Sequence, residues 1–191
     1  MKKIIQMLLI ACLAVLGTQV AFANSDKVTT YDGADITSVH RLAINAPLYM
    51  QVDEKAPNKE ILTQILYDSS HVARCYVLSY DSVAKDIQKD KNVDLKALGR
   101  REAVKAFKEN VGNYADAYVT LTVANNSRTQ FFFDVYKAGT NQLLYSYQIA
   151  QNRSDADTVE TYTNLCEQFY KHFERSVMEQ QKELDKQGKK K

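Results

Sequence analysis

One serine and one lysine have the spacing of a known catalytic pair. Ser82 and Lys85 fit the pattern S-x-x-K, which places a lysine amine one helical turn from a serine hydroxyl that it can deprotonate. Enzymes that use this pair also carry the motifs S-D-N and K-T-G, and this chain has neither. A small serine hydrolase centred on Ser82 and Lys85 is therefore the alternative, and we favour Ser82 as a helix cap.

The histidines and aspartates do not have the spacing of a metal site. His40, His71 and His172 are far apart and form no H-x-x-x-H pair, whereas zinc needs three or four convergent ligands. Aspartates recur every four residues from Asp86 to Asp94, but the turn glycine and the bidentate glutamate of a calcium loop are missing. We therefore expect no metal and no cofactor.

The amino-terminal residues have the layout of a secretory signal peptide. Two lysines precede an apolar run, and a small-x-small end at residues 21–23 predicts cleavage after Ala23. The run is shorter than the roughly 20 residues of a membrane span, so we expect no transmembrane segment after cleavage. An alternative is a lipobox at residues 9–12, which would lipidate Cys12 and tether a periplasmic or extracellular protein to a membrane; we favour Cys12 as an ordinary apolar residue.

Two cysteines, Cys75 and Cys166, remain after cleavage. In an oxidising compartment they could form a disulfide, but sequence alone does not show whether their Cα atoms come within bridging distance. Neither lies in a C-x-x-C motif. A bridge and two buried thiols therefore both stay open, and we favour the thiols.

Length and charge indicate one domain that does not bind nucleic acid. Without residues 1–23, the 191-residue chain is one ordinary domain in length. We expect a flexible entry segment at 24–35, a single domain at 36–180 and a charged tail at 181–191. Without Lys2 and Lys3, the 25 basic residues become 23, which equals the 23 acidic residues, so the formal net charge is zero. A nucleic-acid binder needs a clustered basic surface.

The sheet nucleates in the stretch 115–149. Polar and apolar residues alternate over 118–123, 129–136 and 142–149, with turn residues between these runs. Valine, threonine, tyrosine and phenylalanine dominate them, and these residues suit a pleated, half-buried surface. The pattern predicts an antiparallel meander of three strands.

Two more strands and four helices are expected around this meander. The strands are residues 39–44, which Pro47 ends, and residues 72–80. The first helix follows residues 56–60, and the second is short and follows a cap at Asp81 and Ser82. The third occupies residues 94–111. The fourth begins near Asp157, with Asp155 and Asp157 as caps. The fold class is therefore α+β, in the order β-α-β-α-β-β-β-α, where the second α stands for two consecutive helices, with the helices mainly on one face of a mixed sheet.

The two faces of the meander differ in chemistry. Simple register puts valine, leucine and phenylalanine of 119, 121, 123, 131, 133 and 135 on the core face. The other face is polar with an aromatic and aliphatic patch, which is made of Tyr118, Phe132, Tyr136 and Leu144. If it is exposed, such a patch is a candidate partner-binding site. The alternative is that the first segment or a helix covers this face.

The residues around the meander resemble a domain that recurs in bacterial envelope proteins. The entry Gly112-Asn113-Tyr114-Ala115-Asp116-Ala117-Tyr118-Val119 and the turn at 135–141 are similar to those of the TolB amino-terminal domain, CsgG-like curli-secretion lipoproteins and LpoB-like activators of penicillin-binding proteins. The similarity covers about residues 36–178. It implies a non-catalytic domain that docks onto other envelope proteins. The chain departs from these lipoproteins in lacking a clear lipobox, and it lacks the hairpins of the curli pore.

Taken together, these observations predict a secreted or periplasmic binding domain without enzymatic activity, acting as an accessory protein of the cell envelope. We expect its partner to be another envelope protein. Besides the serine hydrolase, a self-assembling envelope subunit is a further alternative, since an edge strand could pair between copies.

Overall fold

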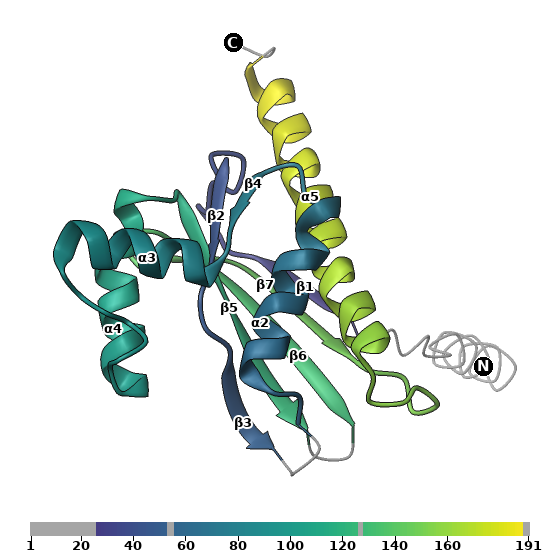
Figure 1. Ribbon diagram of the computed structural model, residues 1–191. Helices are drawn as coiled ribbons and strands as arrows, with labels where there is room; N and C mark the ends of the chain where they lie inside the picture. Colours follow the sequence, from purple (N-terminus) through teal and green to yellow (C-terminus); the bar gives the residue numbers. More distant parts are fainter. Residues whose placement is uncertain (1–25, 53–55, 126–127, 189–191) are drawn as a thin grey trace, which may run out of the picture.

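The computed structural model describes residues 26–52, 56–125 and 128–188 (Figure 1). The predicted signal peptide and Cys12 lie outside these residues. Within them, no helix is both long and apolar enough to cross a membrane.

A seven-stranded mixed sheet forms the centre of the fold. Its strands are β1 Lys27–Thr30, β2 Arg41–Ile44, β3 Leu48–Val52, β4 Tyr76–Leu78, β5 Ala117–Asn125, β6 Thr129–Lys137 and β7 Leu143–Ala150. The spatial order is β1-β7-β6-β5-β2-β4, and β3 pairs with β5 beyond the end of β2. The strands β2, β3, β4 and β5 run parallel, while β1, β6 and β7 add antiparallel pairs. The α+β class with a mixed sheet is confirmed.

The predicted meander is confirmed, and its register is the simple one except for a shift between Val135 and Tyr136. Val119 lies opposite Val135, and Leu121 opposite Phe133; Phe133 in turn lies opposite Tyr147 of β7. These side chains are fully buried. Because side chains alternate along a strand, this register places all the predicted core positions on one face.

The described residues form four α-helices: α2 Lys59–Asp68, α3 Tyr80–Lys91, α4 Arg100–Asn110 and α5 Val159–Gly188. α2 and α5 pack on the core face of the meander, while α3 and α4 form a second core on the opposite face with Ala43, Leu78 and Tyr118. The predicted placement of the helices mainly on one face is therefore wrong. The chain moves outward from β3 to β4 through α2 and back to β5 through α3 and α4, and right-handed connections in opposite directions lie on opposite faces.

The predicted order of elements is wrong at two strands. β1 forms within the expected flexible entry segment, because Lys27–Thr30 pairs with β7 along the sheet edge. β3 follows β2 after only three residues. Pro47 ends β2 as expected, but the chain stays extended and pairs with the next residues of β5.

Several predicted helix ends also differ from the structure. Ser79, rather than Asp81 or Ser82, caps α3 by accepting the Ser82 N–H at 3.1 Å. Residues 94–99 form a turn held by the Asp94 side chain, so α4 begins only after Gly99. At α5 the capping side chain is Thr158, which accepts the Thr161 N–H at 3.2 Å. This helix continues to Gly188, into the segment expected as a tail, with its last eight residues exposed.

Candidate functional site

The predicted partner-binding patch is not one exposed cluster. Tyr118 is fully buried, because α4 covers it: its ring lies 5.9 Å from that of Phe107 and 5.3 Å from that of Tyr136. Leu144 is 3% exposed and belongs to the opposite core. The pairing of β6 with β7 shifts by one residue between Val135 and Tyr136, and this shift turns Leu144 away from the patch. For Tyr118 the alternative of a helix that covers this face therefore holds, and Leu144 does not belong to this face.

Phe132 and Tyr136 remain half-buried on the second face of the sheet. Tyr136 packs at the border of the second core, with the amine of Lys108 5.4 Å from its ring centre. Phe132 lies four residues before Tyr136 on β6, and it pairs with Thr122 of β5 on one side and Gln148 of β7 on the other. We call the half-buried residues of this region, none of which belongs to either core, the open sheet surface: Thr122, Gln130, Phe132, Asp134, Ser146 and Gln148.

The structure does not assemble Ser82 and Lys85 into a catalytic pair. Both side chains are exposed on the first turns of α3. In the described residues no hydrogen bond joins the Ser82 hydroxyl to the Lys85 amine, and the Ser82 N–H is used in the cap by Ser79.

The three histidines also stay apart. His71 faces Glu167 at 3.7 Å, and His172 faces Asp26 at 4.0 Å. His40 contributes its backbone N–H to the Asp116 carboxylate. Among residues 26–52, 56–125 and 128–188, no three histidine, cysteine or acidic side chains converge as metal ligands would.

The two cysteines Cys75 and Cys166 are both free thiols. Cys166 is fully buried on α5, and Cys75 is partly buried just before β4. Burial raises the pKa of the Cys75 thiol to about 12, with a smaller contribution from Glu174, and burial also raises the pKa of Cys166. Both groups are therefore protonated at neutral pH and poor nucleophiles.

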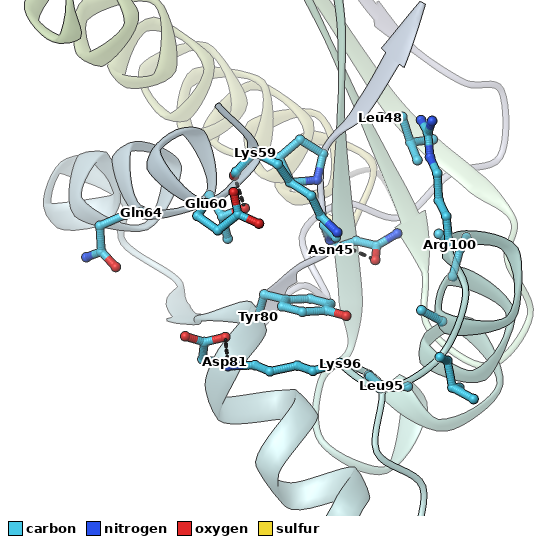
Figure 2. A pocket seen from close by; sticks show the side chains of 16 residues that line it. Asn45, Leu48, Lys59, Glu60, Gln64, Tyr80, Asp81, Leu95, Lys96 and Arg100 are labelled. Atoms are coloured by element: carbon cyan, nitrogen blue, oxygen red, sulfur yellow. Dashed lines mark hydrogen bonds and ion pairs between the residues drawn. The ribbon is translucent and has the colours of Figure 1, made fainter. Parts of the chain in front are cut away.

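A cleft that the sequence did not predict lies beside the carboxyl end of β2 (Figure 2). Its volume is about 410 Å³. The first turns of α2, α3 and α4 border it, together with the β2–β3 connection and the turn before α4. In sheets with parallel strands, ligands bind outside the carboxyl ends of the strands, where helices leave to opposite faces. β2 is at such a place, because α2 and α3 lie on opposite faces.

The floor of the cleft is apolar and its rim is charged. The floor and walls are formed by Ala46, Pro47, Leu48, Tyr80, Leu95, Leu98, Ala103 and Val104. Figure 2 shows Lys59 and Glu60 on one side of Asn45, Arg100 on the other side, and Asp81 with Lys96 below them. Pockets that bind organic ligands commonly combine an apolar lining with a few polar groups.

The charges at the rim are unevenly satisfied. Lys96 and Asp81 form an ion pair at 2.9 Å with both side chains largely exposed, so water screens it. No ion pair within the described residues involves Lys59, Glu60 or Arg100. The amino ends of the three helices add partial positive charge.

The cleft could not be predicted from the sequence, because its lining residues come from separate segments of the chain. Lys59, Tyr80 and Arg100 are about 20 residues apart, and each is the first residue of its helix. Only the topology, which brings three helix starts to the carboxyl end of β2, places them together. A signal that could have pointed to this region is the succession of short strands and helices between residues 41 and 110.

Comparisons with known proteins give distant structural matches. No family model and no curated protein matches the chain. The LpoB C-terminal domain from Escherichia coli aligns at 15% identity over 64% of this chain and 87% of that chain, with a TM-score of 0.47. The same domain from Salmonella enterica aligns at 16% identity over 62% and 85%, with a TM-score of 0.45. A variant of the PelC dodecamer from Paraburkholderia phytofirmans gives 8% identity over 75% and 93%, with a TM-score of 0.44.

The resemblance to LpoB-like proteins thus has a distant structural counterpart, while likeness to TolB and CsgG-like proteins is not shown. Identities and TM-scores at this level carry no argument about function.

Proposed function

We propose that this chain is an exported accessory domain of the bacterial cell envelope, which binds another envelope protein and catalyses no reaction. Two sequence features support export and an envelope role: the signal-peptide pattern at residues 1–23 and the resemblance of the meander to envelope domains. The observation that carries the proposal is the open sheet surface.

The open sheet surface has the composition of a docking site. Phe132 is a half-buried aromatic side chain that belongs to neither core, and its neighbours across the strands are Thr122 and Gln148. Protein interfaces are enriched in such aromatic residues, with polar groups around them. The Asp134 carboxylate accepts a hydrogen bond of 2.6 Å from the Ser146 hydroxyl, which holds part of the polar rim in place.

Site-specific photo-crosslinking in intact cells tests this proposal. A photoreactive residue at Gln148, beside Phe132, should capture one envelope protein, and the same residue at Ile61, which is 51% exposed on α2, should not. Phe132→Ala should abolish the capture without a large loss of stability, because this ring lies outside both cores. Tyr136 is left unchanged, because it stacks on buried Tyr118.

The matched control is Tyr76→Ala, which removes an aromatic ring that is 65% exposed on the edge strand β4. This variant should keep the capture. The proposal fails if capture at Gln148 persists in Phe132→Ala, or if that variant unfolds. Labelling of the purified protein by a fluorescent penicillin, lost in Ser82→Ala, would instead support the serine hydrolase.

A further inference from the structure

We infer that the cleft between α2, α3 and α4 is a second binding site, and that its ligand is the free carboxyl end of a peptide with apolar side chains. This goes beyond the proposed function, because none of the residues lining the cleft belongs to the open sheet surface.

The size and floor of the cleft fit the apolar part of such a ligand. A volume of about 410 Å³ falls in the range of pockets that enclose small organic ligands, roughly 300–1,000 Å³. Leu95 is 1% exposed and Tyr80 is 9% exposed, so the floor is fixed by the second core. Leu98 is 38% exposed at the edge, where an apolar side chain of the ligand would cover it.

The basic groups of the rim fit a carboxylate. Lys59 and Arg100 come from different helices, and neither has an ion-pair partner within the described residues. Arginine binds carboxylates through two parallel N–H donors, and a lysine amine adds a third donor. Because Asp81 is paired with Lys96, the remaining charges are two basic and one acidic, which favours an anionic ligand.

A buried amide at the cleft adds a donor that the protein does not use. Asn45 is fully buried and lines the cleft. Its Oδ1 accepts the Ala46 N–H at 2.9 Å, which fixes the orientation of the amide, and its Nδ2 donates to the Thr120 hydroxyl at 3.2 Å. A side-chain amide carries two N–H donors, and among the described residues only this one acceptor is present. A buried donor without a partner is costly, so a ligand oxygen here would be stabilising.

The mixture of donors and acceptors favours a peptide over a fatty acid. A peptide offers backbone N–H groups as well as carbonyl and carboxylate oxygens, and the Glu60 carboxylate at the rim could accept such an N–H group. A fatty acid has no N–H donor and would leave Glu60 beside a second carboxylate. Capture of a carboxyl-terminal carboxylate is an established mode of peptide recognition.

A titration followed by nuclear magnetic resonance tests the inference. The probe is an N-acetylated pentapeptide ending in Leu-Leu with a free carboxyl group, added to ¹⁵N-labelled protein without residues 1–23. The backbone resonances of Asn45, Leu95 and Arg100 should shift. The same peptide with a carboxyl-terminal amide should bind more weakly by a factor of at least about ten, because the charge-assisted hydrogen bonds are lost.

Variants of the rim test whether the peptide binds in this cleft. Arg100→Gln and Lys59→Gln, both at exposed positions, should each weaken binding severalfold. The matched control Lys85→Gln, at an exposed position of α3 that does not line the cleft, should not. Phe132→Ala should leave peptide binding unchanged, so this test can fail independently of the proposed function. Equal binding of acid and amide peptides, resonance shifts elsewhere, or no shift at millimolar peptide would overturn the inference. Binding of decanoate without binding of peptide would overturn the assignment of a peptide.

Discussion

Phe132 and Phe133 show how one residue step along β6 separates two roles. Phe133 is fully buried and stacks on Phe169 of α5, with ring centres 4.5 Å apart. Truncation of such a ring costs about 3–5 kcal/mol, so a variant at Phe133 would report on folding. Phe132 points to the other face. Its removal leaves both cores intact, which makes it the informative position for partner binding.

The environment of His172 predicts a loss of stability in acid. Its imidazole stacks on Tyr147 at 4.9 Å and lies 4.0 Å from the Asp26 carboxylate. Burial lowers the pKa of His172 below its ordinary value of 6.5; Arg175 acts in the same direction, and Asp26 opposes both. The unfolded chain therefore binds a proton more readily than the folded one. The stabilising contribution is complete above pH 6.5 and decreases as the pH falls toward the pKa of the folded state.

Urea denaturation at pH 7.5 and pH 5 measures this effect. The wild-type protein should lose more unfolding free energy between these pH values than His172→Gln, because the variant has no imidazole to protonate. His71→Gln, at a side chain 63% exposed, is the control and should follow the wild type. An equal loss in wild type and His172→Gln would show that the folded protein does not resist protonation of His172.

At the scale of elements, Gln180 of α5 anchors the end of the entry segment through two hydrogen bonds. The Gln180 Oε1 accepts the Ile36 N–H at 2.8 Å, and its Nε2 donates to the Ala34 carbonyl at 2.6 Å. The helix continues through eight more residues that are all exposed. Gln180→Ala should therefore lower the unfolding free energy by about 1–2 kcal/mol, while truncation after Gln180 should change it by less than about 0.5 kcal/mol.

Thermal and urea unfolding of the two variants test this assignment side by side. The matched control is Gln181→Ala, which removes the same type of side chain from the next position of the helix, where it is exposed. This control should unfold like the wild type. If truncation costs more than Gln180→Ala, the exposed end of α5 has a structural role that its lack of buried residues does not explain.

The elements that could be predicted are those with long periodic patterns. The meander runs over eight or nine residues per strand, so its alternation fixes both the face and the register of Phe131 and Phe133. β1 and β3 have four and five residues, too few for a period to show, and they form because β7 and β5 offer free edges. The cleft could not be predicted for a related reason: no local pattern encodes the meeting of three helix starts.

At the scale of the whole molecule, the two cores differ in how firmly they hold their helices. α5 buries six side chains against the sheet, which are Tyr162, Leu165, Cys166, Phe169, Tyr170 and Phe173. Within its bounds α4 buries only Phe107. Both faces depend on the same strands β2 and β5. A helix held by fewer buried contacts opens at a lower free energy than the sheet that supports it.

We therefore expect α4, with the turn before it, to exchange its amide hydrogens through a local opening, and β5 and β6 to exchange only through global unfolding. Hydrogen exchange measured by mass spectrometry in low concentrations of urea separates the two, since exchange through local opening depends little on urea. The apolar pentapeptide with a free carboxyl end should slow exchange in α4. Arg100 of α4 and the first turn of α2 line the same cleft, so a bound peptide would contact both helices and oppose the local opening. Exchange of α4 and β6 with the same urea dependence would mean that both cores unfold together, and that the cleft does not open on its own.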